Sequence, residues 1–445
     1  MEAPIDKENL RRTTLEAKAD IAKVLRAIAH RKRLEVLVLL MDTKQTFVDL
    51  LRSTKISRTA LANHLSQLIS CGLVERSERG WYQITADGLE MLQAVVQSYI
   101  GSQIRVSNER RRLMEHYARI RVGMSRMKKL ENLKFVPHWV SHLGCLDGCI
   151  QYLGLDISTP WLYGATGHAF VINIHTKDIC PSGPTAWRTQ MLSKLAPNIG
   201  YEVKGVFSTK DAQDFEQKKE EAWILIKREI DAGHPCYGWQ IGDIADFYII
   251  HGYDEIGYYY KGYRQEEGAG PKPWKEIGQM FIEVYGVKKV DPADDVTTVK
   301  DALENVLKHS KNPKEWIYPN YKAGIEGFDA WIKAVENGSA AAFGNAYNAA
   351  CWAECRRYGV EFLQEAKARL RGRAQSLFEE AKEHYEVVAQ KLASVCVLYP
   401  FSPLLKMDPI KVDDKSREAV EALEVARDAE AAGLKTLAKI VGVIQ

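Results

Sequence analysis

Apolar residues recur at helical spacing near the amino terminus of the chain. The run 20–40 is apolar on one side and basic on the other, which predicts a buried helical scaffold with a basic edge. A short helix is expected over 46–53, followed by a turn. Ser57 is a suitable N-cap for a third helix over 58–69, whose leucines repeat at helical spacing. The pattern therefore predicts three helices with a turn before the last.

The third helix carries polar side chains on the face opposite its leucines. After Gly72 the pattern changes to two short strands, 73–76 and 81–85, joined by a tight turn. This order predicts a winged helix-turn-helix domain over 15–86, and such side chains can reach phosphates and base edges in the major groove. The residues expected to contact DNA are Arg58, Thr59, Asn63, His64 and Gln67 of the helix and Arg76 and Arg79 of the wing.

Two motifs in this region resemble the ArsR-type winged helix. The run 27–37 follows the pattern A-x-x-H-x-x-R-L-x-x-L, and the run 57–74 follows S-x-x-x-x-x-x-H-L-x-x-L-x-x-x-G-L-V. The resemblance implies a transcription regulator whose partner is double-stranded DNA. Family metal sensors carry cysteines in the helix before the turn, but 46–51 has none, so we expect no metal there. The alternative is a winged helix used only for protein contact.

Length and charge divide the chain further. At 445 residues it exceeds one ordinary core, so two or three domains are expected. Residues 1–134 hold 25 Lys and Arg against 15 Asp and Glu, a net charge of +10, whereas the remainder holds 36 against 43, or −7. The positive field thus coincides with the expected DNA-binding part.

Location is also suggested by composition. No apolar run approaches membrane-spanning length, the amino terminus lacks a signal-peptide core, and eight cysteines are too sparse for a disulfide framework. We therefore expect a cytoplasmic protein with no membrane partner.

The segment 87–134 has an irregular apolar stripe at helical spacing and predicts one long helix. Winged-helix proteins commonly pair through flanking helices, so a homodimerisation helix is the leading interpretation. The alternative is a spacer packed on its own domain. The basic cluster 110–112 is interpreted as a solvated face.

From Pro137 the pattern becomes mixed, and 136–292 is expected to form an α+β domain. A helix is predicted over 145–153, a strand over 169–174 and a helix over 212–232. Further strands are predicted at 235–241, 246–253, 257–260 and 280–287. A cysteine at a helix start followed by an antiparallel sheet is the plan of papain-like enzymes.

This part resembles the papain-like domain of butirosin biosynthesis protein H and of leader-peptide-cleaving bacteriocin transporters. The motifs that carry the resemblance are H-x-x-C-L at 142–146, Y-L-G at 152–154, Y-G-A-T-G-H-A-F at 163–170, G-H-P-C-Y-G-W at 233–239 and D-F-Y-I-I-H-G-Y-D at 246–254. The resemblance implies a thiolate nucleophile at Cys145 and an imidazole at the first residue of the strand that ends in Gly-Tyr-Asp, which is the strand expected over 246–253.

Asp246 stands where the resemblance requires that imidazole. His251 lies five residues further along the same strand, so the alternation of side chains directs it to the opposite face unless a bulge intervenes. If the domain is an enzyme, Cys145, His168 and Asp246 are its expected catalytic residues, although His142, His175 and His234 remain possible sources of an imidazole.

A cleft without this relay is expected to bind a small molecule. Aromatic walls with a few polar anchors are typical of such sites. The residues expected to line it are Tyr163, His168, Phe170, Trp239, Asp246 and Tyr248, each of which also suits ordinary packing. No cofactor is expected. The cysteine pairs 145/149 and 351/355 are spaced for one helix face, and close helix packing explains them better than zinc.

The remainder, 293–445, is predicted to be helical almost throughout. Helices are expected over 296–310, 324–336, 340–370, 372–398 and 416–443, forming a bundle that packs on the papain-like domain and closes its cleft with Tyr347, Asn348 and Trp352. The expected fold class is therefore an α+β multidomain protein with a winged helix, a papain-like domain and a helical bundle.

These observations favour a dimeric DNA-binding regulator whose carboxy-terminal two-thirds senses a small-molecule effector of unknown identity. The competing hypothesis is a cysteine-dependent acyltransferase or peptidase that uses Cys145, with the winged helix placing the enzyme or controlling its gene. A third is a scaffold that recruits partners. Sequence alone leaves the three open.

Overall fold

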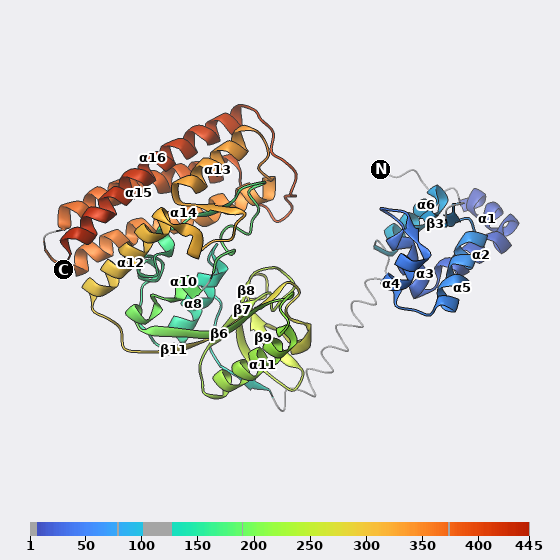
Figure 1. Ribbon diagram of the computed structural model, residues 1–445, viewed down its shortest axis with the longest axis horizontal. Coiled ribbons are helices and arrows are strands. Elements are labelled where there is room, and N and C mark those ends of the chain that lie inside the picture. The colour runs from blue at the N-terminus through green and yellow to red at the C-terminus, as the bar shows by residue number, and fades with distance from the viewer. Residues whose placement is uncertain (1–6, 78–79, 101–126, 189, 373, 445) are drawn as a thin grey trace. The chain divides into compact units, whose positions relative to one another are not determined.

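The computed structural model describes residues 7–77, 80–100, 127–188, 190–372 and 374–444 (Figure 1). The chain divides into two compact units, 1–119 and 120–445, and each is described by itself. We call them the amino-terminal and the carboxy-terminal unit.

The amino-terminal unit contains the predicted helix, turn, helix and two-stranded wing, but the predicted helical run 20–40 divides into two helices, 18–28 and 31–39, because His30 caps the second. The helix over 7–16 and the short strand over 45–46 were not predicted. A short antiparallel sheet has the strand order β1-β3-β2, and the leucines of α5 pack into the buried core. The described elements are α1 (Lys7–Glu16), α2 (Lys18–Ile28), α3 (Arg31–Leu39), β1 (Gln45–Thr46), α4 (Phe47–Thr54), α5 (Arg58–Ser70), β2 (Val74–Arg76), β3 (Trp81–Ile84) and α6 (Ala86–Ile100).

Caps set the limits of the two central helices. Thr46 and Asp49 form a capping box at the start of α4. Lys55 ends that helix in the left-handed region, with φ of 52°, which turns the chain toward α5. Ser57 Oγ then accepts a hydrogen bond from the backbone N–H of Ala60 at 3.2 Å, as its predicted N-cap role requires. The turn between α4 and α5 is therefore determined by interactions between residues that are close in the sequence.

An antiparallel sheet organises the first part of the carboxy-terminal unit. Its strand order is β10-β9-β8-β7-β11-β6, with β4 added beside β8, and β5 and β12 form a separate pair. The strands are β4 (Lys128–Lys129), β5 (Asn173–His175), β6 (Tyr201–Thr209), β7 (Cys236–Trp239), β8 (Phe247–Tyr253), β9 (Gly257–Lys261), β10 (Ala269–Pro273), β11 (Phe281–Lys289) and β12 (Tyr321–Ala323).

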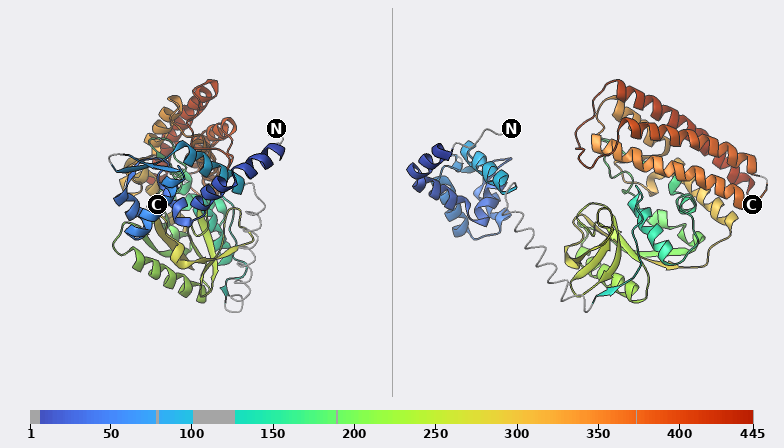
Figure 2. Two further views of the ribbon diagram at one scale, coloured as in Figure 1. Left: turned by 90° about the vertical axis from the view of Figure 1, so that its right-hand side faces the viewer. Right: turned by 180° about the vertical axis from the view of Figure 1, so that it is seen from behind.

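Helices cover this sheet and continue into a bundle. Helix α11 packs on β6 and β11, whereas α8 packs on β8. Figure 1 and the right-hand view of Figure 2 show the long helices α14, α15 and α16 running side by side. The helices are α8 (Ser141–Tyr152), α9 (Thr159–Ala165), α10 (Gln190–Ser193), α11 (Phe215–Asp231), α12 (Asp295–Lys311), α13 (Gly324–Glu336), α14 (Ala342–Arg369), α15 (Gln375–Leu398) and α16 (Asp414–Val443), with 3-10 turns η1 (His168–Phe170), η2 (Ala196–Ile199), η3 (Trp274–Glu276) and η4 (Pro313–Glu315).

A buried ion pair joins two parts of the carboxy-terminal unit. We call the part with the antiparallel sheet, up to the end of β11, the mixed domain, and the helices α12 to α16 the bundle. Arg356 of α14 and Glu430 of α16 are 0 % and 1 % exposed, and Nε and Nη2 of the arginine each donate to one carboxylate oxygen, at 2.8 and 3.0 Å. Arg356 Nη1 donates to the backbone carbonyls of Ala169 and Val171, at 2.8 and 3.0 Å. One side chain thus holds three segments that are far apart in the sequence.

The same contact explains one wrong prediction. The strand expected over 169–174 is replaced by the η1 turn and the short strand β5. Two carbonyls that a sheet partner would have used accept their hydrogen bonds from Arg356 instead. A residue from the distant bundle therefore overrides the local strand pattern.

Other boundaries also differ from the sequence pattern. The helix predicted over 87–134 is described as α6 up to Ile100, the part 101–126 lies outside the described residues, and its last part forms β4 because Lys128 and Lys129 pair with Tyr253 and Gly252 of β8. Strands β6 and β10 were not predicted. Both lie at sheet edges, and β10 contains two prolines, which are depleted in strands.

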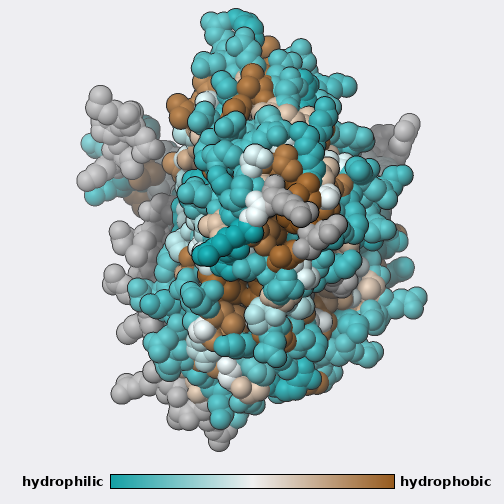
Figure 3. Space-filling model, turned by 90° about the vertical axis from the view of Figure 1, so that its left-hand side faces the viewer, coloured by the Kyte–Doolittle hydropathy of each residue, from teal (hydrophilic) through white to brown (hydrophobic). Residues whose placement is uncertain are grey.

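One face of the molecule is mostly polar (Figure 3). Figure 3 shows a largely hydrophilic face on which apolar side chains gather in small groups near the middle. Among the described helices, none is both long enough and apolar enough to cross a membrane.

Replacing Arg356 tests the buried ion pair. Arg356→Ala should lower the free energy of unfolding of the carboxy-terminal unit by about 3–5 kcal/mol, because it leaves Glu430 buried without a partner. Urea unfolding followed by tryptophan fluorescence reports on this unit, since Trp81 is the only one of the ten tryptophans outside it. The control is Arg357→Ala, which removes an exposed pair with Glu361 and should change stability by about 1 kcal/mol or less. Equal effects of the two substitutions would contradict the assignment.

Candidate functional site

The start of α8 and the start of β8 meet at Ser141 and Asp246. The Ser141 hydroxyl donates a hydrogen bond to Asp246 Oδ1, and the backbone N–H of Phe247 donates to the same oxygen at 3.1 Å. Burial raises the pKa of the Asp246 carboxyl to about 6, although both hydrogen bonds oppose the shift. Within the described chain, no lysine or arginine forms an ion pair with this carboxyl. The site thus contains a carboxyl group without a counter-charge.

Cys145 does not occupy the start of the helix. The helix predicted from Cys145 begins four residues earlier, at Ser141, so the thiol lies inside the helix and is fully buried. Burial raises the pKa of the Cys145 thiol well above its usual value, and Cys149 and Asp246 add to the shift. A thiol in these surroundings stays protonated at neutral pH.

The imidazoles considered for a relay are not bonded to Cys145. His168 begins η1, and both of its ring nitrogens and both of those of His142 lack a hydrogen-bond partner in the described part of the chain. Burial lowers the pKa of each ring to about 3, so both are neutral. His251 lies near Lys261 and Lys129, and burial together with these charges lowers its pKa to about 4. The described residues therefore show no relay of the papain type.

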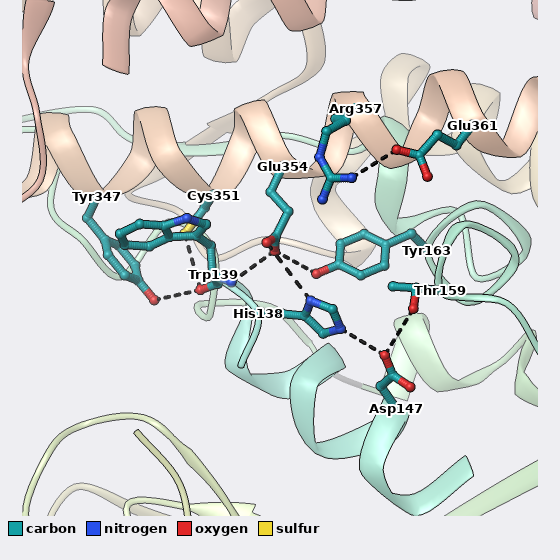
Figure 4. Close-up of polar contacts among 10 residues, drawn as sticks. All are labelled: His138, Trp139, Asp147, Thr159, Tyr163, Tyr347, Cys351, Glu354, Arg357 and Glu361. Carbon is teal, nitrogen blue, oxygen red and sulfur yellow. Dashed lines mark hydrogen bonds and ion pairs between the residues drawn. The ribbon is translucent and has the colours of Figure 1, made fainter. Parts of the chain in front are cut away.

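Helix α14 lies against the segment just before α8. Figure 4 shows Tyr347, Cys351 and Glu354 pointing from α14 toward Trp139. The Trp139 carbonyl accepts hydrogen bonds from the Tyr347 hydroxyl at 3.2 Å and from Cys351 Sγ at 3.4 Å. The Trp139 N–H donates to Glu354 Oε1 at 2.9 Å. The bundle therefore covers the start of α8, two residues from Ser141.

A second polar network lies beside this contact. His138 Nε2 is 2.8 Å from Asp147 Oδ2, and its Nδ1 is 4.0 Å from Glu354 Oε2 (Figure 4). Thr159 Oγ1 donates to Asp147 at 3.2 Å, and the Tyr163 hydroxyl donates to Glu354 at 2.7 Å. The imidazole is thus held between two carboxylates that are themselves hydrogen-bonded, which fixes the approach of α14 to α8.

The residues expected to line a cleft are spread over several places. Tyr163 and His168 are neighbours, with ring centroids 6.2 Å apart. Phe170 packs on Phe362 and Tyr385 of the bundle. Each of the remaining aromatic rings packs on a different partner: Trp239 stacks on Phe281, and Tyr248 contacts Tyr260. Asp246 bonds to Ser141 and lies near Tyr248, whose pKa is raised by burial with a further contribution from Asp246.

The expected closing residues Tyr347, Asn348 and Trp352 also separate. Tyr347 faces Trp139, whereas the Asn348 amide donates to the Cys180 carbonyl at 3.0 Å and Trp352 Nε1 donates to Asn348 at 3.1 Å. Sequence reasoning missed Ser141, His138 and Glu354. A usable signal was present, because 347, 351 and 354 share one helix face.

The expected DNA-contacting residues of α5 divide into two groups. Arg58, Thr59 and Asn63 are exposed. His64 is half-buried against His30, with ring centroids 4.5 Å apart, and burial followed by the charges of His30 and Arg33 lowers its pKa. Arg76 of β2 is exposed and lies 5.6 Å from the centre of the Tyr82 ring, and Arg79 lies outside the described residues.

Comparison with known proteins agrees with this geometry. Residues 30–76 match the family described as bacterial regulatory protein, arsR family. Residues 30–76 form an ArsR-family helix-turn-helix domain. Two solved structures are similar to this part of the chain. The first is reduced HlyU from Vibrio cholerae N16961, which is 24% identical over 20% of this chain and 97% of that one, with a TM-score of 0.18. The second is the homodimeric winged helix-turn-helix DNA-binding domain of Mb0332 from Mycobacterium bovis, a possible ArsR-family transcriptional regulator, which is 25% identical over 23% of this chain and 93% of that one, with a TM-score of 0.19. No curated protein matches the chain.

In the ArsR-family domain, the histidine and arginine of the first motif hold α5 in place. His30 caps α3 by accepting a hydrogen bond from the Lys32 N–H at 3.1 Å. The buried Arg33 donates from Nη1 to Gln67 Oε1 at 2.6 Å and from Nη2 to the Arg26 carbonyl at 2.8 Å. The amide oxygen of Gln67 is therefore bound to the scaffold. Gln67 was expected to contact DNA, and this hydrogen bond was not predicted.

The unpaired carboxyl at the start of β8 gives a prediction for stability. Because the pKa of Asp246 is about 6 in the folded chain and near 3.8 in the unfolded chain, this carboxyl lowers the stability of the fold as pH rises from 3.8 to about 6, and its destabilising effect is constant above that range. Asp246→Asn should keep the hydrogen bond from Ser141 and raise the free energy of unfolding by about 1–2 kcal/mol above pH 6, allowing for solvent screening. The gain should vanish in acid.

Thermal unfolding across this pH range is the measurement. Asp243→Asn is the matched control, because Asp243 has an 86 % exposed side chain three residues earlier. A stabilisation by both variants, or by neither, would count against a raised pKa of the Asp246 carboxyl in the folded chain.

Proposed function

We propose that the chain is a DNA-binding transcriptional regulator that places α5 in the major groove. The observation that carries this is the exposed face of α5, where Arg58, Thr59 and Asn63 stand free of the scaffold within the ArsR-family domain. The net charge of +10 over 1–134 supports it, because phosphate attraction supplies much of the affinity for DNA.

The carboxy-terminal unit is proposed to be an effector-binding part of that regulator. The proposal starts from the papain-like resemblance of the sequence, and this unit contains helices packed on an antiparallel sheet. The buried, protonated Cys145 and the neutral His168 speak against thiol catalysis. The half-buried Asp246 without a counter-charge supports binding instead, since carboxyl groups in such surroundings are concentrated at functional sites.

We also propose that two copies of the chain pair through the amino-terminal unit. Helices α1, α2 and α6 expose large apolar side chains, which a stable monomer would ordinarily cover. These side chains are Leu10, Leu15, Ile21, Leu25, Leu89 and Val96. A second copy is the favoured occupant, because a two-fold pair would present two α5 helices to successive turns of DNA.

Arg58→Ala tests the DNA assignment. The loss of a phosphate or base contact should weaken binding about tenfold and, if the contact is to phosphate, lower the salt dependence by about one ion. Fluorescence anisotropy with duplex DNA at several salt concentrations measures both. Arg357→Ala removes the same charge from α14 and should leave binding unchanged. Unchanged binding by Arg58→Ala would argue strongly against α5 as the reading helix.

Charges on α6 test the dimer. Leu89 and Val96 lie seven residues apart and are 40 % and 44 % exposed. The double variant Leu89→Glu, Val96→Glu should shift the full chain from dimer to monomer in analytical ultracentrifugation, because each carboxylate would be buried in an apolar interface. Val397→Glu, at a side chain that is 81 % exposed on α15, is the control and should stay dimeric. A monomeric parent protein would contradict the proposal directly.

A further inference from the structure

One oxygen of Asp246 is left for a partner that the described chain does not supply. Both hydrogen bonds to this carboxyl go to Oδ1, from Ser141 and from the Phe247 N–H. Oδ2 has no hydrogen-bond partner among the described residues, and it is not among the fully buried unpaired atoms. Oδ2 therefore keeps some exposure to solvent, while Ser141 keeps Oδ1 in place.

Aromatic residues lie near this carboxyl, because its partner Ser141 is two residues from Trp139, whose carbonyl accepts a hydrogen bond from Tyr347. Asp246 lies close enough to Tyr347 to add to the rise in its pKa, after burial and Cys351. The centroid of the Tyr347 ring is 6.2 Å from that of Trp139 and 5.9 Å from that of Phe401, and Trp139 remains 39 % exposed. We call Asp246, Trp139, Tyr347 and Phe401 the carboxylate–aromatic site.

The aromatic part of the site comes from three separate segments. Trp139 precedes α8, Tyr347 is on α14, and Phe401 is on the loop that follows α15. That loop is attached to the start of α14, because the Phe343 N–H donates to the Lys406 carbonyl at 3.0 Å and the Ala342 N–H to the Asp408 carbonyl at 2.8 Å. The rings are therefore held in place by backbone hydrogen bonds.

The charges around Asp246 favour a cation. The titratable side chains near Asp246 include Cys145, Cys351, Tyr248 and Tyr347, all with raised pKa values and therefore neutral at pH 7. Glu354 adds a further acidic group on α14. An ionised carboxyl in such surroundings gains most from a positive group, and aromatic faces attract cations through their quadrupoles. An anionic ligand would be repelled by the ionised carboxylate of Asp246.

We infer that the carboxylate–aromatic site binds an organic ammonium ion, with the nitrogen at Asp246 Oδ2 and an apolar body against Trp139, Tyr347 and Phe401. The inference rests on the proposal that the carboxy-terminal unit holds an effector. Because α14 supplies Tyr347 and the preceding segment supplies Trp139, such a ligand contacts both the mixed domain and the bundle.

Binding of three matched probes to the full chain tests the inference. 2-Phenylethylammonium chloride, sodium phenylacetate and 2-phenylethanol share one ring and differ in charge. Isothermal titration at neutral pH and constant ionic strength should show millimolar binding of the ammonium probe alone. Asp246→Asn should weaken that binding at least about tenfold, as the loss of a charge-assisted hydrogen bond implies. Trp139→Ala should weaken it through loss of the ring contact.

Asp243→Asn is the control for charge and should bind the ammonium probe like the parent. Equal binding of phenylacetate or phenylethanol, unchanged binding by Asp246→Asn, or no binding of the ammonium probe by the folded parent would each overturn the inference. Arg58→Ala separates the two proposals, because it should lose DNA and retain the ammonium probe. A parent chain that binds the probe but not DNA would refute the regulator while leaving this site standing.

Discussion

The buried pair of Arg356 and Glu430 is the interaction on which the carboxy-terminal unit depends. A charge with no exposure is stable only when it is well paired, and each nitrogen of the Arg356 guanidinium has a partner, either the carboxylate of α16 or the two carbonyls near η1. These partners come from positions 169, 171 and 430, so they can meet only in the complete fold. The ion pair therefore specifies how the bundle and the mixed domain fit together.

This constraint also determines where the candidate site lies. Once Arg356 anchors α14 in the bundle, the neighbouring positions 347, 351 and 354 face the segment before α8 and bond to the backbone of Trp139. Asp246, at the start of β8, is then surrounded by neutral thiols and tyrosine. Among the described residues, no lysine or arginine forms an ion pair with its carboxyl. These surroundings raise the free energy of the ionised carboxyl, and the packing of α14 and α8 keeps Asp246 in them. Carboxyl groups with such perturbed pKa values are concentrated at functional sites, which is why we connect Asp246 with ligand binding.

Local patterns predicted α4, α5 and the two strands of the wing closely. The leucine repeat of α5, the N-cap Ser57 and the alternation of the wing act over a few residues, so the sequence sufficed to place them. The arrangement of the residues expected to contact DNA was only partly predictable. Exposure of Arg58 and Asn63 follows from helix periodicity, whereas the use of Gln67 by Arg33, thirty-four residues away, does not.

In the carboxy-terminal unit the sequence by itself determined most helices, the central strands of the sheet and the unusual aspartate at position 246. Only the tertiary structure decided that Ser141 rather than Cys145 meets that aspartate, that the segment after His168 turns instead of forming the predicted strand, and that α14 covers the start of α8. The physical reason is the range of the interactions. Periodicity and capping are read within one or two helical turns, whereas buried charges and hydrogen bonds select partners from anywhere in the chain.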